Sequence, residues 1–232
     1  MMRLDKLLTD LGLGTRSQVK DYIKKGLVLV DGVKAKKPED KVNPDSVTIT
    51  FQGKDYTYSQ YVYYIMNKPA GLITATEDSK EETVMDLFYR MQPEAPKGLS
   101  PAGRLDKDTT GLLLITNDGG LIHSLLSPKR HVMKKYFVTL DGPLTAEDVH
   151  ALEKGVHIGQ GEDTAPAQVE YQGGNTCYIS ISEGKFHQVK RMFFAVGRRV
   201  EELKRVSFGP IQLDEKELPV GTVRQIDGSI FS

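Results

Sequence analysis

Residues 103–120 read GRLDKDTTGLLLITNDGG, and this stretch decides how the chain folds. Residues 112–115 (LLLI) are apolar without interruption and stand between turn residues, which is typical of a short strand buried on both faces. Charged side chains come immediately before this strand: Arg104, Asp106, Lys107 and Asp108. Because an unpaired carboxylate is unfavourable beside a buried strand, we expect these charges to be paired or to form part of a site.

The composition is that of an ordinary globular protein. A chain of 232 residues can form one large domain, or a small and a medium one, each with a real core. Its 31 basic residues balance 31 acidic ones, so no net charge attracts a charged partner. The single cysteine, Cys177, excludes an internal disulfide and is expected to be a small buried hydrophobic residue. We expect a cytoplasmic protein, because no apolar window is long enough to span a membrane and the charged N-terminus is unlike a signal peptide.

Basic residues are nevertheless concentrated in three segments. Residues 3–37 hold nine basic and four acidic side chains, residues 128–135 hold four basic and no acidic ones, and residues 183–206 hold seven basic and three acidic ones. Such clustering favours one positive face with an acidic, solvated face opposite, as in proteins that bind nucleic acid. The alternative is that each segment is only a soluble surface.

The first 52 residues form a predicted helix–helix–hairpin unit. Leucines in residues 4–11 follow helical spacing, and glycines at 12 and 14 end that helix. Thr15 and Gln18 form a capping-box pattern for a second helix, which Gly26 ends. Asp31-Gly32 between two strand-like runs is a strong hairpin signal, and residues 47–51 (VTITF) predict one more strand.

This unit resembles the small RNA-binding domain, or alpha-L motif, first described in a small-subunit ribosomal protein and reused in RNA-modifying enzymes. Residues 3–8 and 23–32 match its pattern, although its usual Ser-Arg order is reversed here as Arg16-Ser17. The resemblance implies contacts to RNA phosphates that do not read sequence. The basic residues expected to make them are Arg3, Lys6, Arg16, Lys20, Lys24, Lys34 and Lys36. A packing subdomain with a solvated basic face is the alternative.

Residues 53–61 are predicted to be a linker, and residues 62–232 a second domain. Strand patterns fall within residues 61–68, 112–115, 134–140 and 168–183, and helix patterns within residues 83–91, 119–126, 144–155 and 186–197. Strands and helices that do not alternate regularly predict an α+β domain with a mixed, largely antiparallel sheet.

Several common chemistries do not fit the charged residues before the buried strand. A calcium loop starting at Asp106 would have Asn117 where a bidentate Glu is required. The five histidines show no close pairing, so a metal site is not expected. The chain also has no phosphate-loop motif and no nucleophile elbow around a serine.

Four motifs resemble those of the ribosomal small subunit pseudouridine synthase A family of pseudouridine synthases. They are MNKPAGLI (66–73), GRLDKDTTGLLLITNDG (103–119), KKYFV (134–138) and EGKFHQVKRMF (183–193). The resemblance covers essentially the whole chain. It implies a cofactor-free and metal-free isomerase that converts a uridine of small-subunit ribosomal RNA to pseudouridine.

The resemblance also implies roles for individual residues. Asp106 matches the catalytic carboxylate, which acts either as a nucleophile at the sugar or as a base. A carboxylate in a dry pocket needs a cation to remain ionised, and Lys190 matches the family's cation, with Arg191 as the second choice. Tyr136 matches the aromatic residue that packs against the flipped base, and Arg104 matches a residue that fills the vacated space or holds the flipped phosphate. Taken alone, Tyr136 could be a core aromatic residue, and Arg104 and Asp106 a structural ion pair.

The sequence leaves other functions open. The chain could act on a large-subunit uridine, it could be a non-catalytic ribosome assembly factor, or, more distantly, it could be a hydrolytic glycosylase. The expected partner is small-subunit ribosomal RNA or the assembling small subunit, with the protein acting as a monomer away from membranes.

Overall fold

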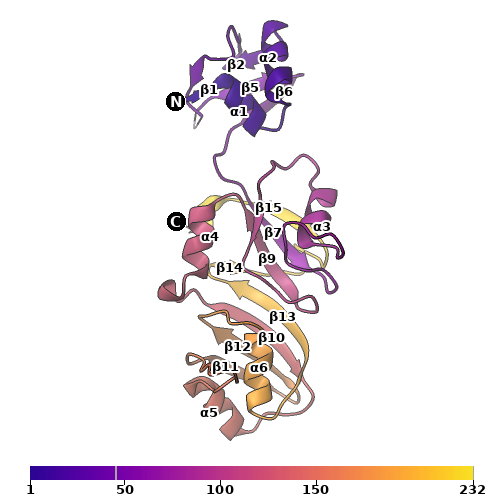
Figure 1. The fold of residues 1–232 in the computed structure, drawn as a ribbon, viewed down its shortest axis with the longest axis vertical. Coiled ribbons are helices and arrows are strands. Elements are labelled where there is room, and N and C mark those ends of the chain that lie inside the picture. Colours follow the sequence, from indigo (N-terminus) through magenta and orange to yellow (C-terminus); the bar gives the residue numbers. More distant parts are fainter. Residues whose placement is uncertain (45, 232) are drawn as a thin grey trace. The chain divides into compact units, whose positions relative to one another are not determined.

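The computed structural model describes residues 1–44 and 46–231, which form two compact units. The first comprises Met1–Val62 and Pro93–Leu99, and the second comprises residues 63–92 and those from 100 onward. Each unit has its own hydrophobic core. Figure 1 shows the elements of both units.

The first unit packs two helices against a small sheet. The predicted capping box is present at Thr15 and Gln18, and the predicted hairpin turns at Asp31-Gly32, where both residues have positive φ. Four strands pair in the order β3-β2-β5-β6, with β1 paired separately to β4. The elements are β1 (Met2–Arg3), α1 (Leu4–Asp10), α2 (Arg16–Lys24), β2 (Val28–Val30), β3 (Val33–Lys34), β4 (Lys41–Val42), β5 (Thr48–Phe51) and β6 (Lys54–Thr57).

The prediction of a linker over residues 53–61 is wrong for its first half. Strand β6 lies inside that range and pairs antiparallel with β5 over four residues. The turn between the strands places Gln52 and Gly53 at positive φ. Sequence reasoning missed this strand because KDYT buries no apolar stripe: its residues are mostly exposed, so main-chain pairing rather than packing defines it.

The second unit contains a sheet of nine strands. Its order is β11-β12-β10-β13-β9-β7-β15, with β14 paired to β13 and β8 to β9. Among the described strands only β13 and β9 run parallel, which confirms the α+β fold with a mixed, largely antiparallel sheet. The strands are β7 (Tyr63–Lys68), β8 (Ser100–Ala102), β9 (Thr110–Thr116), β10 (Lys134–Leu140), β11 (Gln168–Gly173), β12 (Thr176–Ile181), β13 (Val200–Phe208), β14 (Ile211–Gln212) and β15 (Val223–Ile226).

Strand β9 lies in the interior of this sheet, as the apolar run predicted. The four residues 112–115 are completely buried. Four helices flank the strands, and two of them, α3 and α5, begin with a capping box. The helices are α3 (Val84–Met91), α4 (Gly119–Leu126), α5 (Ala146–Lys154) and α6 (Gln188–Ala195), with short 3-10 turns at Pro128–Arg130 and Gly228–Phe231.

The single cysteine lies in the interior of the second unit. Cys177 is completely buried, and burial raises the pKa of its thiol to about 11. Within residues 1–44 and 46–231, every helix is too short or too polar to cross a lipid bilayer.

Candidate active site

A buried ammonium group, that of Lys68, binds the loop of residues 106–109 that precedes β9. Lys68, at the end of β7, is completely buried, and its Nζ donates to the backbone carbonyls of Pro69 (3.1 Å), Asp106 (3.1 Å), Lys107 (3.3 Å) and Thr109 (2.8 Å). Burial lowers the pKa of Lys68 to about 8, against the attraction of nearby carboxylates. One side chain therefore fixes three carbonyls of the 106–109 loop, the segment that carries Asp106.

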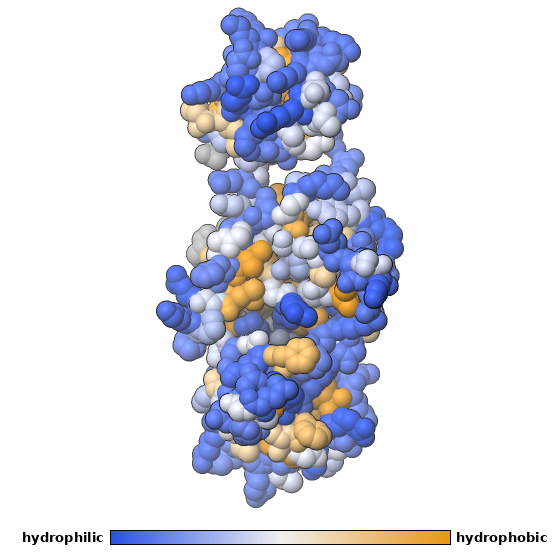
Figure 2. Space-filling view, in the orientation of Figure 1, coloured by the Kyte–Doolittle hydropathy of each residue, from blue (hydrophilic) through white to orange (hydrophobic). Residues whose placement is uncertain are grey.

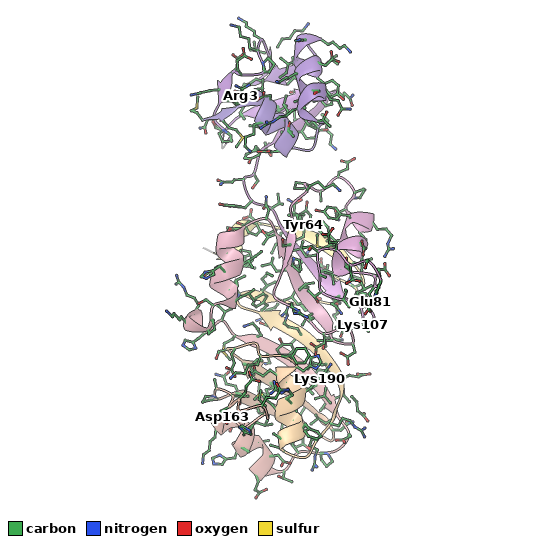
Figure 3. All side chains as sticks on the ribbon, in the orientation of Figure 1. Arg3, Tyr64, Glu81, Lys107, Asp163 and Lys190 are labelled. Atoms are coloured by element: carbon green, nitrogen blue, oxygen red, sulfur yellow. The ribbon has the colours of Figure 1, made fainter. Side chains whose placement is uncertain are left out.

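Replacing Lys68 by Met is expected to lower the free energy of unfolding by about 3 kcal/mol or more, because it leaves buried carbonyls without a donor. Urea unfolding followed by circular dichroism would measure the change. Lys107→Met is the matched control: its ammonium pairs with Glu81 on the exposed surface, as the labelled side chains in Figure 3 show, and its loss should change stability by less than about 1 kcal/mol. Equal, small effects of the two substitutions would contradict the bracing role.

Asp106 forms an ion pair with Lys190 of α6. Lys190 Nζ lies 3.0 Å from one Asp106 oxygen and 2.5 Å from Asp108, and Figure 3 labels Lys190 on its helix. Burial lowers the pKa of Lys190, but hydrogen bonds to Asp108 and Asp106 more than offset it, so the net direction is upward. The Lys190 ammonium is therefore charged at neutral pH, and it lies beside the Asp106 carboxylate. The Nε2 atom of His187 lies 3.5 Å from the second Asp106 oxygen.

Arg191, the second choice for the cation, points elsewhere. Its Nη1 pairs with Glu162 at 2.7 Å, and its other donors reach the carbonyls of Ile158 and Gly159. Adjacent helical residues project about 100° apart, so only one of Lys190 and Arg191 can face Asp106. The expectation that Arg191 supports the site directly is thus not met; it ties α6 to the 158–162 loop.

Asp106 opens into a cavity of about 430 Å³ within the second unit. Tyr136 of β10 and Arg104 line the same cavity, so the predicted residues Asp106, Tyr136 and Arg104 come together here. Tyr136 is largely buried whereas Arg104 is exposed, and Asp106 pairs with Lys190 rather than with Arg104. Figure 2 shows apolar residues in several separate patches on an otherwise mostly hydrophilic surface.

Two buried cations in the cavity wall were not predicted as site residues. Arg205 on β13 is 1% exposed, and Lys134 on β10 is 7% exposed. From the sequence, Lys134 belongs to a basic segment and to the KKYFV motif, and neither assigns it a role. Arg205 lies in β13, a strand that sequence patterns did not predict. In the sheet it pairs with Tyr136 of β10, so the two residues lie side by side.

The segment before α6 borders the cavity on another side. Phe186 stacks on His187, with ring centroids 3.8 Å apart, and both residues line the cavity. The Gln188 side chain accepts from the Lys185 backbone N–H and donates to Glu183. His187 adopts a left-handed backbone conformation (φ 48°), which turns the chain sharply into the helix that carries Lys190.

The basic residues predicted to contact RNA in the first unit are all exposed. Arg16, Lys20 and Lys24 follow each other at four-residue spacing and so share one face of α2. The aliphatic part of Lys34 lies close to Gly26, just beyond that helix. Arg3 pairs with Asp5 and Lys6 with Asp10 inside the unit. Lys36 is exposed next to the hairpin.

The arrangement in the second unit is suited to nucleophilic or acid–base chemistry by a carboxylate. It offers one partly exposed carboxylate beside a fixed ammonium, a buried tyrosine, and two further cations in the cavity wall. Among the described residues, no three His, Cys, Asp or Glu side chains gather as a metal site.

Sequence comparison relates both units to known families. Residues 62–195 match the model of the family described as RNA pseudouridylate synthase, and residues 2–47 match the S4 domain.

Individual relatives match along almost the whole chain. An uncharacterized RNA pseudouridine synthase of Bacillus subtilis is 48% identical, over 97% of this chain and 95% of the relative. The ribosomal small subunit pseudouridine synthases A of Vibrio cholerae and Escherichia coli K12 are 40% and 38% identical, over 92% and 94% of this chain and 91% and 94% of the relatives. A crystal structure of a pseudouridylate synthase has a TM-score of 0.67 and 35% identity, over 99% of this chain and 97% of that one.

Proposed function

Because the chain belongs to the RNA pseudouridine synthase family, in its ribosomal small subunit pseudouridine synthase A branch, we propose that it isomerises one uridine of small-subunit ribosomal RNA to pseudouridine. The observation that carries the proposal is the Asp106 carboxylate, which lines a cavity and is paired with Lys190 at 3.0 Å. The small-subunit target is supported by the names of relatives that match along almost the whole chain. The enzyme is an isomerase, so its product has the atoms of its substrate.

Asp106 is the catalytic residue in this proposal. Its carboxylate either bonds to C1′ of the uridine or removes the C2′ proton, and in both routes the C1′–N1 bond breaks with its electron pair staying on the base. The base then turns, and C5 bonds to C1′ while Asp106 is released, or returns its proton to C2′. The C5 proton is lost and N1 takes up a proton, so atoms and electrons balance without a redox step. The ion pair with Lys190 at 3.0 Å holds the Asp106 carboxylate in position.

The base must leave its stack to reach Asp106. Extrusion of a base requires a few kcal/mol, and stacking on a side chain offsets part of this. We assign the stacking role to Tyr136, which is largely buried in the cavity wall. The exposed Arg104 side chain at the same cavity can fill the space that the flipped base leaves in the RNA, or it can bind the phosphate of the flipped nucleotide.

The S4 domain supplies RNA affinity in this account. Its match over residues 2–47 and the exposed row of Arg16, Lys20 and Lys24 support phosphate contacts by α2. Lys34 and Lys36 extend the same basic surface at the hairpin, and Arg3 and Lys6 contribute through charges that their carboxylate neighbours partly neutralise.

A double substitution, Lys20→Ala with Lys24→Ala, is expected to weaken RNA binding and to reduce the slope of log K against log salt by about 2, since each lost phosphate contact removes about 1. Filter binding over a series of salt concentrations would measure the slope. Lys25→Ala is the control, because that ammonium pairs with Asp21 at 2.8 Å. A slope unchanged by the double substitution would rule out α2 as an RNA contact.

Product analysis tests the reaction itself. The purified full chain is incubated with small-subunit RNA, large-subunit RNA and partly assembled small subunits, and nucleosides are then separated by chromatography. We expect pseudouridine only with small-subunit substrates. Pseudouridine in large-subunit RNA would move the target to the other subunit, free uracil would indicate a glycosylase, and no product with any substrate would favour a non-catalytic assembly factor.

A further inference from the structure

Two cations line the buried wall of the cavity without a carboxylate partner. Arg205 is 1% exposed and Lys134 is 7% exposed, and neither forms an ion pair with an acidic side chain in the described part of the chain. The two come from adjacent antiparallel strands, β13 and β10. Burying a charge without a partner is unfavourable by several kcal/mol, so two such charges side by side call for a functional explanation.

The hydrogen bonds of both groups are incomplete. Arg205 Nε donates to the Leu112 carbonyl at 2.7 Å, but its Nη2 finds no acceptor within the described residues. Lys134 Nζ donates to the Val132 carbonyl at 3.1 Å, and an ammonium has three protons to donate. Burial, ahead of repulsion by Arg205, lowers the pKa of Lys134 to about 8. Both cations also lie over the Phe208 ring, Arg205 at 4.8 Å and Lys134 at 5.6 Å from its centroid, and Arg205 Nη2 is closed off from solvent. Both residues line the cavity, so Lys134 is the donor that an occupant can reach, and Arg205 beside it adds a second positive charge to the wall.

The neighbours of Arg205 indicate which part of a nucleotide this acceptor is. Arg205 pairs with Tyr136 across the sheet, and Tyr136 is the proposed stacking partner of the flipped base. A phosphate carries a full charge and strong hydration, which suits the exposed Arg104 better than a buried wall. Uracil is flat and largely apolar and has two carbonyl oxygens, O2 and O4, so it matches a buried wall with a few convergent donors.

We infer that Lys134 binds a carbonyl oxygen of the flipped uracil and that Lys134 and Arg205 together stabilise the negative charge that the base acquires when the C1′–N1 bond breaks. This inference rests on the proposed function. The electron pair of the broken bond stays on N1 and is delocalised onto O2 and O4, while Asp106 bonds to C1′ or removes the C2′ proton. Cations that are in place before the reaction stabilise such an anion more than they stabilise the neutral base. This difference lowers the activation free energy of bond cleavage.

The effect expected from one lost donor is large. Removal of one preorganised donor to a developing oxyanion lowers kcat by about 10²–10³. We therefore expect Arg205→Met and Lys134→Met, in the full chain, to lower the single-turnover rate by about 10²-fold or more, with RNA affinity unchanged. Lys135→Met is the matched control: Lys135 is the next residue on β10, pairs with Glu170 and does not line the cavity, so its rate should stay within about twofold of wild type.

A second measurement separates charge stabilisation from a merely structural role. RNA carrying 5-fluorouridine at the target position has a base that leaves more readily as an anion, because fluorine withdraws electrons. Cleavage of its C1′–N1 bond should depend less on the two cations, so the defect of Arg205→Met and Lys134→Met should shrink about tenfold or more with this substrate. Arg205→Lys, which restores a charge, should recover part of the rate with the normal substrate.

Each other outcome overturns the inference. Equal defects with both substrates, together with a lower melting temperature, would make the two cations structural. Weaker RNA binding with a normal cleavage rate would assign them to a phosphate. Wild-type protein run in parallel keeps the two proposals apart: no pseudouridine from wild type contradicts the proposed function, whereas active wild type with equally active variants overturns only this inference.

Discussion

Asp106→Asn should abolish pseudouridine formation, lowering the single-turnover rate by about 10⁴-fold or more, as expected when the reacting group itself is removed. An amide can neither attack C1′ nor accept the C2′ proton at neutral pH. RNA affinity should stay within about threefold, because one neutralised charge is small beside the phosphate contacts of the S4 domain. The fold should persist, since Lys190 keeps Asp108 as a partner.

Asp108→Asn provides the matched control for this substitution. Asp108 also pairs with Lys190, but its side chain is 74% exposed, and exposed ion pairs contribute about 1 kcal/mol or less. We expect its rate to fall by less than about tenfold in the same assay. Retained turnover in Asp106→Asn, or equal loss in both variants, would show that the carboxylate at 106 is not the reacting group.

Gly111→Ala is expected to destabilise the protein by about 3 kcal/mol or more, as measured by urea unfolding. Gly111 lies near the start of β9 with φ +98°, a conformation unfavourable for residues with a side chain. A Cβ there would also lie 2.3 Å from the backbone oxygen of Arg205, which cannot move aside because β9 and β13 pair at this point. The yield of soluble protein should be low. Its activity should also be low, because the pairing of β9 with β13 positions both Arg205 and the loop that carries Asp106.

Gly119→Ala tests whether the effect belongs to the position rather than to alanine. Gly119 is the first residue of α4 and is exposed, and a methyl group added to its Cα would have no neighbouring atom within 4 Å. Alanine should leave stability unchanged or raise it by up to about 1 kcal/mol. Similar destabilisation by the two substitutions would contradict the close packing of β9 against β13.

Local sequence signals predicted most of the elements around the site. The run at 112–115 predicted β9, because four apolar residues between turn residues can be satisfied only by burial on both faces. Capping patterns and the Asp31-Gly32 turn predicted helix starts and a hairpin, since these depend on hydrogen bonds and φ angles within a few residues. Motif resemblance then directed attention to Asp106, Tyr136 and Lys190, whose roles in the reaction remain proposals.

The elements that sequence missed depend on distant partners. Strand β13 (VEELKRVSF) mixes charged and apolar residues without clean alternation, yet it joins β10 to β9 and is the longest strand described. Its Arg205 is buried because β13 lies between β9 and β10, and no pattern within the strand predicts this burial. Similarly, Lys68 was expected to shape a turn, whereas its four carbonyl acceptors come mostly from a segment about 40 residues away.

The choice between Lys190 and Arg191 also required three-dimensional information. Both are basic and adjacent in sequence, and helical phase alone does not fix which one faces the 106–109 loop. The phase is set by the left-handed residue His187 and by the Glu183–Gln188 hydrogen bond, which together determine where α6 begins.

Mapping pseudouridine in ribosomal RNA tests whether Asp106 of this protein modifies one small-subunit uridine. RNA from cells that lack this protein is compared with RNA from the same cells supplied with the wild-type chain or with Asp106→Asn. We predict that one small-subunit uridine is left unmodified without the protein, is modified again with wild type, and stays unmodified with Asp106→Asn. An unchanged small-subunit RNA would contradict the proposed reaction, and modification restored by Asp106→Asn would contradict the catalytic role of Asp106.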